Sequence, residues 1–417
     1  MFFICIIMII LFNTINKQYL KTNYKILNPL SIFIYVWFFV LIVHKLYFEK
    51  QYYTNTAYIL ILSGITALAI GFWLFAKTNI VNVNRCSYVY NEDIMKKILF
   101  ILTIIEILRL IYMSYVVFSL AGSFSMFLSN NTYVRNLYLV RESGLIENFT
   151  EFFLNINAML GYVTVGIYST INKKIKIRYI FVWSLLELLY AIVTMSKMCF
   201  IVFLSVLFIT CMNNLINIKI QKRIFLRYIP ILALVIFGFL LVIGKQRNYS
   251  QFGESIIQVV INKAFFYFSG SVEALAKYIS LYTSEVALGK NSFTIFYRVL
   301  SRLNIVSNNS ILSSHSEFID IAHESTNVYT FFRTFYMDYS FAGFIIGPFL
   351  MGTVAGLFYN PKRTSFFCDV CTSWISSVLA LSFYSYMWGQ SIYIIILLYA
   401  YFIDKVFGEK LYLKQDF

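Results

Sequence analysis

The chain contains little charge. Of its 417 residues, 13% are Asp, Glu, Lys or Arg, against roughly 25% in an average soluble domain. Hydrophobic residues make up 60% of the sequence, which is more apolar surface than a soluble fold can hide. The composition therefore excludes an ordinary soluble domain and favours a protein that lies in a bilayer.

Several motifs of known chemistry are absent from the sequence. No glycine-rich phosphate-binding loop is found, which disfavours ATP-driven transport and chemistry on nucleotide sugars. The six cysteines include one isolated CxxC pair, Cys368 and Cys371, and none lies in residues 245–338. His323-Glu324 is not followed by the second histidine of a zinc-binding HExxH pattern. We therefore expect no disulfide framework, no metal and no cofactor.

Long apolar runs occupy most of the chain. A membrane-spanning helix needs about 20 predominantly apolar residues, and the runs predict an all-α polytopic membrane protein with about 11 transmembrane helices. Helices 1–8 are expected in residues 1–244, a long loop in residues 245–338, and helices 9–11 with a tail in residues 339–417, all in one integrated membrane domain. The first run, Met1–Phe12, lacks the flanks of a cleavable signal peptide and is expected to remain as a short span.

Three of the later spans lie on either side of the long loop. The eighth is expected at about residues 228–244, the ninth at about 340–359 and the tenth at about 370–388. In the ninth, Gly352 and Gly356 are four residues apart, a spacing that lets a second helix approach closely.

The positive charge is distributed unevenly. The net charge is +15, and most basic residues fall in short clusters between apolar runs, such as those in residues 173–178 and 219–227. Because cytoplasmic loops of membrane proteins are enriched in Lys and Arg, the clusters mark the cytoplasmic side. The N-terminus and the long loop are then outside and the C-terminus is inside. The same clustering disfavours nucleic acid as a partner.

The long loop is rich in aromatic and apolar residues, for example in residues 265–268, 272–282 and 293–303. A disordered segment would be poor in them. We expect short amphipathic helices that lie on the outer membrane face.

Basic side chains in and near this loop are candidate phosphate ligands, because an arginine donates two parallel hydrogen bonds to phosphate oxygens. Anchoring to lipid headgroups is the alternative. The candidates are Lys197, Lys245, Arg247, Arg298, Arg302 and Arg333.

Two of the three histidines, His315 and His323, also lie in the loop, with Glu317, Asp320 and Glu324 nearby. A histidine beside a carboxylate can act as a general base at neutral pH. The alternative is a histidine on a polar surface.

Charged residues also occur inside expected spans, where they are usually paired or functional. Glu106 and Arg109 are three residues apart on one helix face and can neutralise each other, and Glu187 lies in the sixth span. Tyrosines of the loop region fit either sugar stacking or an interfacial belt; they are Tyr249, Tyr267, Tyr278, Tyr282, Tyr297, Tyr329, Tyr336 and Tyr339.

The end of the loop reads Asn327-Val328-Tyr329-Thr330-x-x-Arg333-x-x-Tyr336-x-Asp338-x-x-x-x-Gly343 and is followed by a glycine-rich span. This motif of under 20 residues, with the span count and the late extracytoplasmic loop, resembles the Wzy-type oligosaccharide repeat unit polymerases of bacteria. The resemblance implies a GT-C-like fold in the bacterial inner (plasma) membrane.

The resemblance also implies a reaction. A growing glycan on undecaprenyl diphosphate would be transferred to a new repeat unit on a second undecaprenyl diphosphate, as the lipid diphosphate leaves. Cations would hold the diphosphate, a role that fits Arg247, Arg333, Arg298, Arg302, Lys245 and Lys197. The base would be His323, Glu324 or Asp338, and Asn327, Tyr329 and Tyr336 would contact substrate. Membrane lipids, a chain-length regulator and a flippase are the expected partners, and no ATP is needed.

Three alternatives remain. An O-antigen ligase performs the same chemistry with another acceptor. A flippase or other transporter of lipid-linked sugars would show internal repeats and short loops, neither of which is found. A non-catalytic partner in polysaccharide assembly is the third.

Overall fold

The computed structural model describes residues 2–21, 25–48, 54–81, 89–129, 131–141, 144–171, 176–215, 221, 226, 238, 241, 255–281, 286–306, 318–321, 324–359, 365–387 and 391–413. These residues form two compact units. Unit 1 contains residues 1–86, 263–364 and 374–395, and unit 2 contains residues 87–262, 365–373 and 396–417.

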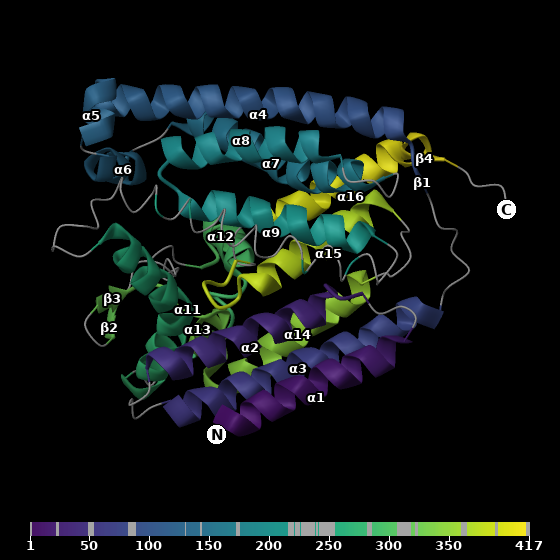
Figure 1. Cartoon of the computed structure of the whole chain (residues 1–417), viewed down its shortest axis with the longest axis vertical. Helices are drawn as coiled ribbons and strands as arrows, with labels where there is room; N and C mark the ends of the chain where they lie inside the picture. The colour runs from purple at the N-terminus through teal and green to yellow at the C-terminus, as the bar shows by residue number, and fades with distance from the viewer. Residues whose placement is uncertain are drawn as a thin grey trace. The chain divides into compact units, whose positions relative to one another are not determined.

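Unit 1 is built mainly from long apolar helices (Figure 1). Its elements are α1 (Phe2–Leu20), α2 (Pro29–Tyr47), α3 (Thr54–Val81), most of α11 (Ile256–Leu281), α12 (Thr294–Arg302), the antiparallel strands β2 (Ile319–Ile321) and β3 (Glu324–Thr326), α13 (Phe331–Tyr339), the 3-10 turn η3 (Ser340–Ala342), α14 (Gly343–Phe358) and the second half of α15 (Phe366–Ala380).

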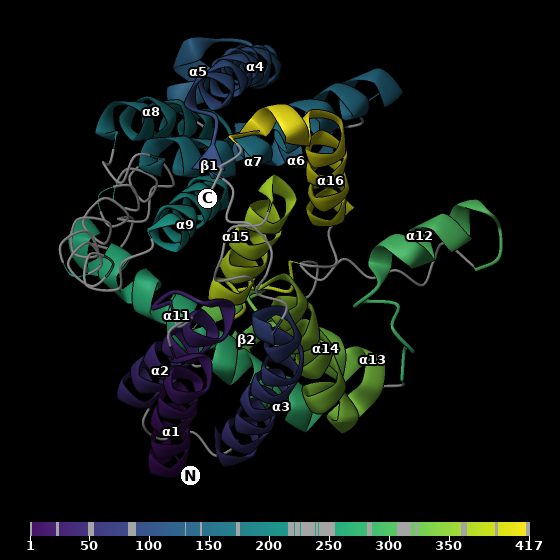
Figure 2. The ribbon, with the colours of Figure 1, turned by 90° about the vertical axis from the view of Figure 1, so that its right-hand side faces the viewer.

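Helices α3 and α14 lie side by side along their length, as Figures 1 and 2 both show. Glycines make this close approach possible. A methyl group at Gly352 would lie 2.1 Å from the carbonyl oxygen of Leu68, and one at Gly356 would lie 2.6 Å from that of Phe72. Both distances are far shorter than a non-bonded contact of a carbon atom, so no side chain fits at either position. The close packing predicted from the glycine spacing is confirmed.

Unit 2 contains most of the middle of the chain. Its elements are β1 (Val89–Tyr90), α4 (Glu92–Ala121), α5 (Phe124–Ser129), α6 (Asn131–Val140), α7 (Leu145–Thr170), α8 (Ile177–Val193), α9 (Lys197–Asn214), the first half of α15, most of α16 (Ser391–Leu411) and β4 (Tyr412–Leu413).

In unit 2, β1 and β4 pair as a short antiparallel ladder. Next to it, the Tyr412 hydroxyl donates to Asp404 at 2.6 Å and accepts a hydrogen bond from the backbone N–H of Phe366. Burial raises the pKa of Tyr412, so the phenol stays protonated and remains a donor at neutral pH. This contact joins the start of α15 to the end of α16.

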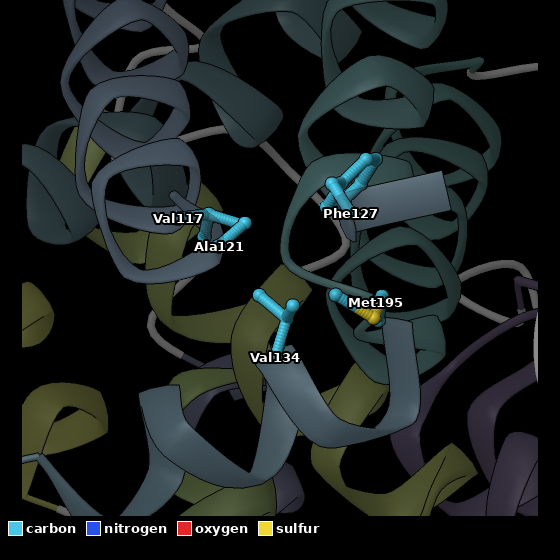
Figure 3. Close-up of a cluster of buried hydrophobic side chains, with 5 residues drawn as sticks. All are labelled: Val117, Ala121, Phe127, Val134 and Met195. Atoms are coloured by element: carbon cyan, nitrogen blue, oxygen red, sulfur yellow. The ribbon is translucent and has the colours of Figure 1, made fainter. Parts of the chain in front are cut away.

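At the other end of α4, a small apolar cluster joins four segments of unit 2. Figure 3 shows Val117 and Ala121 from α4, Phe127 from α5, Val134 from α6 and Met195 from the turn after α8. All five side chains are buried. The cluster therefore holds the short helices α5 and α6 against the longer ones.

Two helices of unit 2 show a polarity opposite to that of soluble proteins. The buried side of α4 includes Glu106 and Arg109, whereas large apolar side chains such as Phe100 and Ile111 are exposed. On α8, Glu187 is buried and Phe181 is exposed. An apolar exterior around a charged interior suits a lipid environment, because charged residues in membranes face the protein interior.

Within the described residues, five helical segments are long and apolar enough to cross a membrane. They are Phe2–Leu20, Pro29–Tyr47, Thr54–Ala76, Leu145–Thr170 and Phe331–Phe358, which joins α13, η3 and α14. Two shorter apolar helices are Met198–Asn214 and Phe366–Ala380. The mainly helical membrane class is thus supported, and the count of about 11 spans and the three-part division of the chain stay predictions. Most of the expected eighth span lies outside the described residues.

The first helix is longer than predicted: it ends at Leu20 and not near Phe12. Its polar second half is tolerated because Asn16 is buried and donates to Asn28 at 3.1 Å and to Ser31 at 3.0 Å. The sequence could not reveal these partners, which belong to the start of α2.

The long loop also differs from the prediction of short helices alone. α12 has nine residues and fits that prediction, but α11 has 26 residues. The loop also contributes the β2–β3 hairpin and all but the last residue of α13, which runs to Tyr339 before η3 and α14 follow. From residue 263 onward, the described part of the loop is therefore a folded part of unit 1.

Candidate functional site

Helix α13 is held in place by α2 and by the segment that follows α15. The backbone N–H of Phe331 donates to the carbonyl oxygen of Ser382 at 2.8 Å. The indole of Trp37 donates to the hydroxyl of the same Ser382 at 3.0 Å, and its ring lies 5.1 Å from that of Phe332. These contacts fix the first turn of α13, from which Arg333 projects.

Arg333 is buried, with 3% of its surface exposed, and its guanidinium contacts two tyrosine rings. The guanidinium carbon lies 3.7 Å from the ring centre of Tyr329 and 4.5 Å from that of Tyr278 on α11. Cation–π contacts at these distances are attractive and are stronger where water is excluded. The two phenols therefore hold a permanent positive charge in a fixed orientation.

Arg333 lines a small pocket of unit 1 that is partly open, with about 220 Å³ of unfilled space that includes open solvent. The other lining side chains carry hydroxyl or amide groups: Asn327, Tyr329, Thr330, Thr334, Tyr384, Ser385 and Tyr386. The hydroxyl of Thr330 is buried and makes no hydrogen bond within the described structure. Hydroxyls, phenols and an amide around one cation suit an anionic ligand that also carries hydroxyl groups.

One wall of the pocket comes from a stretch predicted to be transmembrane helix. The tenth span was expected at about residues 370–388, but α15 ends at Ala380 and residues 381–387 leave the helix. In a membrane protein, irregular backbone at depth is tolerated where it is buried in protein or lines a cavity. The early end of α15 is therefore a feature of the site, and it exposes Tyr384, Ser385 and Tyr386 to the pocket.

Asp338, a predicted base, has another environment. Its side chain is fully buried, and its two oxygens accept four hydrogen bonds at 2.6 to 3.0 Å from the backbone and side chains of Asn291 and Ser292. It does not line the pocket. The geometry makes Asp338 the anchor of the segment that leads into α12, and it leaves few acceptor sites for a substrate proton.

Tyr336 is likewise part of the packing of α13. It is 2% exposed, and its ring contacts those of Tyr278, Phe341 and Phe344 at 5.5 to 6.2 Å. The predicted motif therefore divides into two halves. Asn327, Tyr329 and Arg333 line the pocket. Tyr336 and Asp338 do not line it and instead stabilise α13 and the segment before α12.

Each remaining candidate either lies away from the pocket lining or has a side chain outside what the structure describes. Arg298 and Arg302 on α12 are exposed and are not among the lining residues. Glu324 lies in β3 opposite Ile321, and the structure describes only its backbone. Lys197 begins α9 in unit 2, and its side chain is not described. Lys245, Arg247, His315 and His323 lie outside the described residues, so their roles stay predictions.

Unit 1 also contains a buried row of hydrogen-bonded polar side chains that was not predicted from the sequence. His44 on α2 is 0% exposed, and its Nδ1 lies 2.8 Å from the Tyr58 hydroxyl, while Nε2 lies 3.2 Å from Glu273 Oε2. Glu273 belongs to α11, five residues before Tyr278. A histidine and a glutamate in apolar surroundings were the available signals, but 229 positions separate them.

The described fold indicates a helical membrane protein, and its site is a polar pocket with a buried arginine held by tyrosines. Comparison of the chain with known protein families, with curated proteins and with solved structures gives no match. The family expectation therefore continues to rest on the residues of the motif and on the pattern of spans.

Proposed function

We propose that the protein is a glycosyltransferase that joins undecaprenyl-diphosphate-linked repeat units into an O-antigen or capsular polysaccharide. In this proposal the pocket faces the outside of a bacterial inner membrane and the C-terminus is cytoplasmic. The growing chain is transferred to the non-reducing end of a new unit. The lipid diphosphate is the leaving group, so no nucleotide is required.

The observation that supports this proposal is Arg333, which combines burial, two tyrosine contacts and a place in the pocket wall. Negative charge develops on the diphosphate as its bond to the sugar breaks. A preorganised cation at that position stabilises the transition state more than the ground state. The hydroxyl and amide groups of the lining suit the sugar that is attached to the diphosphate.

The identity of the general base remains a prediction. A general base must come within hydrogen-bond reach of the attacking sugar hydroxyl. His323 and Glu324 precede the pocket residue Asn327 in the chain, and we propose that one of them accepts the proton. Asp338 is less suited, because both its oxygens are already occupied by Asn291 and Ser292.

The role of the Arg333 cation can be tested in a reconstituted reaction. Purified protein with a synthetic undecaprenyl-diphosphate repeat unit and no nucleotide should form long chains. Arg333→Ala should lower the rate by about 100-fold or more, as removal of one oxyanion-stabilising donor does in other enzymes. Arg333→Lys keeps the charge but not the planar two-pronged geometry, and should retain only part of the activity.

Arg298→Ala is the matched control, because Arg298 is an exposed arginine of the same loop. It should polymerise normally, and the amount of each variant in the membrane should be unchanged. Full activity of Arg333→Ala would overturn the role of the pocket. Arg247→Ala tests the second predicted phosphate ligand in the same way. A lipid A-core acceptor in place of the repeat unit tests the ligase alternative.

A further inference from the structure

A second buried polar site lies in unit 2 and is independent of the function proposed above. Arg109 on α4 is 3% exposed and donates through one nitrogen, Nη1, to two carboxyl groups. The distances are 2.9 and 3.0 Å to the two oxygens of Glu106, and 2.9 Å to Oε1 of Glu187 on α8. Both glutamates are 0% exposed. The pair expected from the sequence is thus a cluster of three.

The described groups that contact this cluster are neutral. Arg109 Nε donates to Asn155 of α7 at 3.0 Å, and the guanidinium lies 3.5 Å from the ring centre of Tyr190. The other titratable groups facing the cluster are the phenols Tyr138 on α6 and Tyr162 on α7 and the thiol Cys199 on α9. On the far side of Tyr138, Arg141 is a cation that is paired with Glu151.

Among the side chains that the structure describes, the charges of the cluster therefore do not balance. Two ionised carboxylates against one guanidinium would leave one negative charge fully buried. Such a charge is costly, and a buried carboxyl takes up a proton instead. Because both glutamates contact the same nitrogen, their carboxyl groups are also close neighbours, which disfavours ionisation of both.

One carboxylate oxygen of the cluster has no hydrogen-bond donor in the described structure, so it is the place where a proton would bind. Oε2 of Glu187 is buried and receives no hydrogen bond within the described structure. Its partner oxygen, Oε1, is held by Arg109, so Oε2 belongs to the cluster. A carboxylate oxygen in an apolar interior needs a donor or a proton.

We propose that Glu106, Arg109 and Glu187 form a proton-binding site, in which the two carboxyl groups share one exchangeable proton at neutral pH. Binding forms an O–H bond on one carboxyl group, and the other carboxylate remains paired with Arg109. The cluster is then electrically neutral. Release of the proton would create a buried negative charge between α4 and α8.

Infrared spectroscopy of the purified protein tests the proposal directly. The wild type should show the C=O stretching band of a protonated carboxyl group, and this band should shift in D2O. Glu106→Gln and Glu187→Gln should each remove it, because the remaining glutamate is then ionised against Arg109. Glu147→Gln, which changes an exposed glutamate of α7, should keep it. Persistence of the band in both single variants would overturn the proposal.

Thermal unfolding gives a second readout. Folding would retain a proton that the unfolded chain releases above about pH 5. The contribution of this proton to stability is therefore complete at low pH and is lost as the pH rises, so the Tm of the wild type should fall. This pH dependence of the Tm should vanish in Glu187→Gln, which mimics the protonated carboxyl group. The double variant Glu106→Gln/Glu187→Gln leaves Arg109 without a counter-charge and should have a much lower Tm.

A metal cation in place of the proton is the competing outcome. If sodium or potassium chloride raised the Tm of the wild type but not of Glu187→Gln, and the infrared band were absent from the wild type, the ligand would be a monovalent cation and the proton assignment would be wrong. Single glutamine variants as unstable as the double variant would also contradict it, because both negative charges would then be needed.

Discussion

Asp338 acts on the pocket through another residue. Its carboxylate binds the backbone and hydroxyl of Ser292, and the carbonyl oxygen of Ser292 accepts a hydrogen bond from Tyr386 at 2.9 Å. Tyr386 lines the pocket that contains Arg333. A carboxylate at position 338 thus positions a pocket wall without itself contacting the space inside.

Asp338→Asn should therefore lower stability. The amide replaces one acceptor oxygen by an NH2 group that faces donors, so about 1–3 kcal/mol of folding free energy should be lost. Thermal unfolding in detergent measures this as a lower Tm, with a moderate loss of activity. Asp320→Asn, at an exposed position of β2, should leave the Tm unchanged. An unaltered Tm with complete loss of activity would instead make Asp338 the base.

Part of the site could be predicted at this scale. Asn327, Tyr329 and Arg333 lie within seven consecutive positions, so a local motif contains them. Tyr278 and the segment at 384–386 could not be found this way, because their approach to Arg333 depends on how α11 and the end of α15 pack. His44 and Glu273 were missed for the same reason.

At the scale of elements, the contact between α3 and α14 depends on the absence of side chains. The carbonyl oxygen of Leu68 occupies the space where a side chain at position 352 would begin. Helices in membranes associate through such close backbone approach, because the bilayer supplies no hydrophobic force between them. The spacing of glycines in α14 therefore fixes its position against α3.

Gly352→Ala should destabilise unit 1 by about 1–3 kcal/mol, the range for overpacking a tight interface. The methyl group would meet backbone atoms, which cannot move aside as a side chain can. Gly144→Ala is the control, because no atom lies within 4 Å of a methyl group there. The Tm of the two variants in the same detergent gives the comparison, and equal values would argue against the packing of α3 and α14.

Some elements could be predicted and others could not. Continuous apolar runs predicted α2, α3 and α7 because a run of that length has no other stable place. The length of α11 was missed because Lys263, Glu273 and Lys277 interrupt its apolar pattern. The structure explains one of these charges, since Glu273 is paired with His44 inside unit 1.

At the scale of the whole molecule, the placement of charge predicts which side each part faces. The basic clusters predict that the C-terminus faces the cytoplasm and that the long loop faces the outside. Exposed positions in both regions allow a direct test. Arg298 on α12 and Lys410 on α16 are exposed in the structure.

In a variant that lacks the six native cysteines, R298C should react with a membrane-impermeant maleimide in spheroplasts. K410C should react only after the membrane is permeabilised. The expected difference follows from the sidedness of the two regions and not from burial, since both side chains are exposed. Labelling of K410C in intact spheroplasts would invert the predicted topology.

The charged cluster of unit 2 also bears on how the chain enters the membrane. α4 carries its own counter-charge, because Glu106 and Arg109 are one turn apart and already paired along one helix. In the predicted topology both helices are spans. α8 carries Glu187 with no basic residue within two turns, so we expect its insertion into the apolar layer to cost least when the charge of this carboxyl group is neutralised. We therefore expect Glu187 to meet Arg109 only after both helices have been inserted, so that the buried cluster of unit 2 forms late.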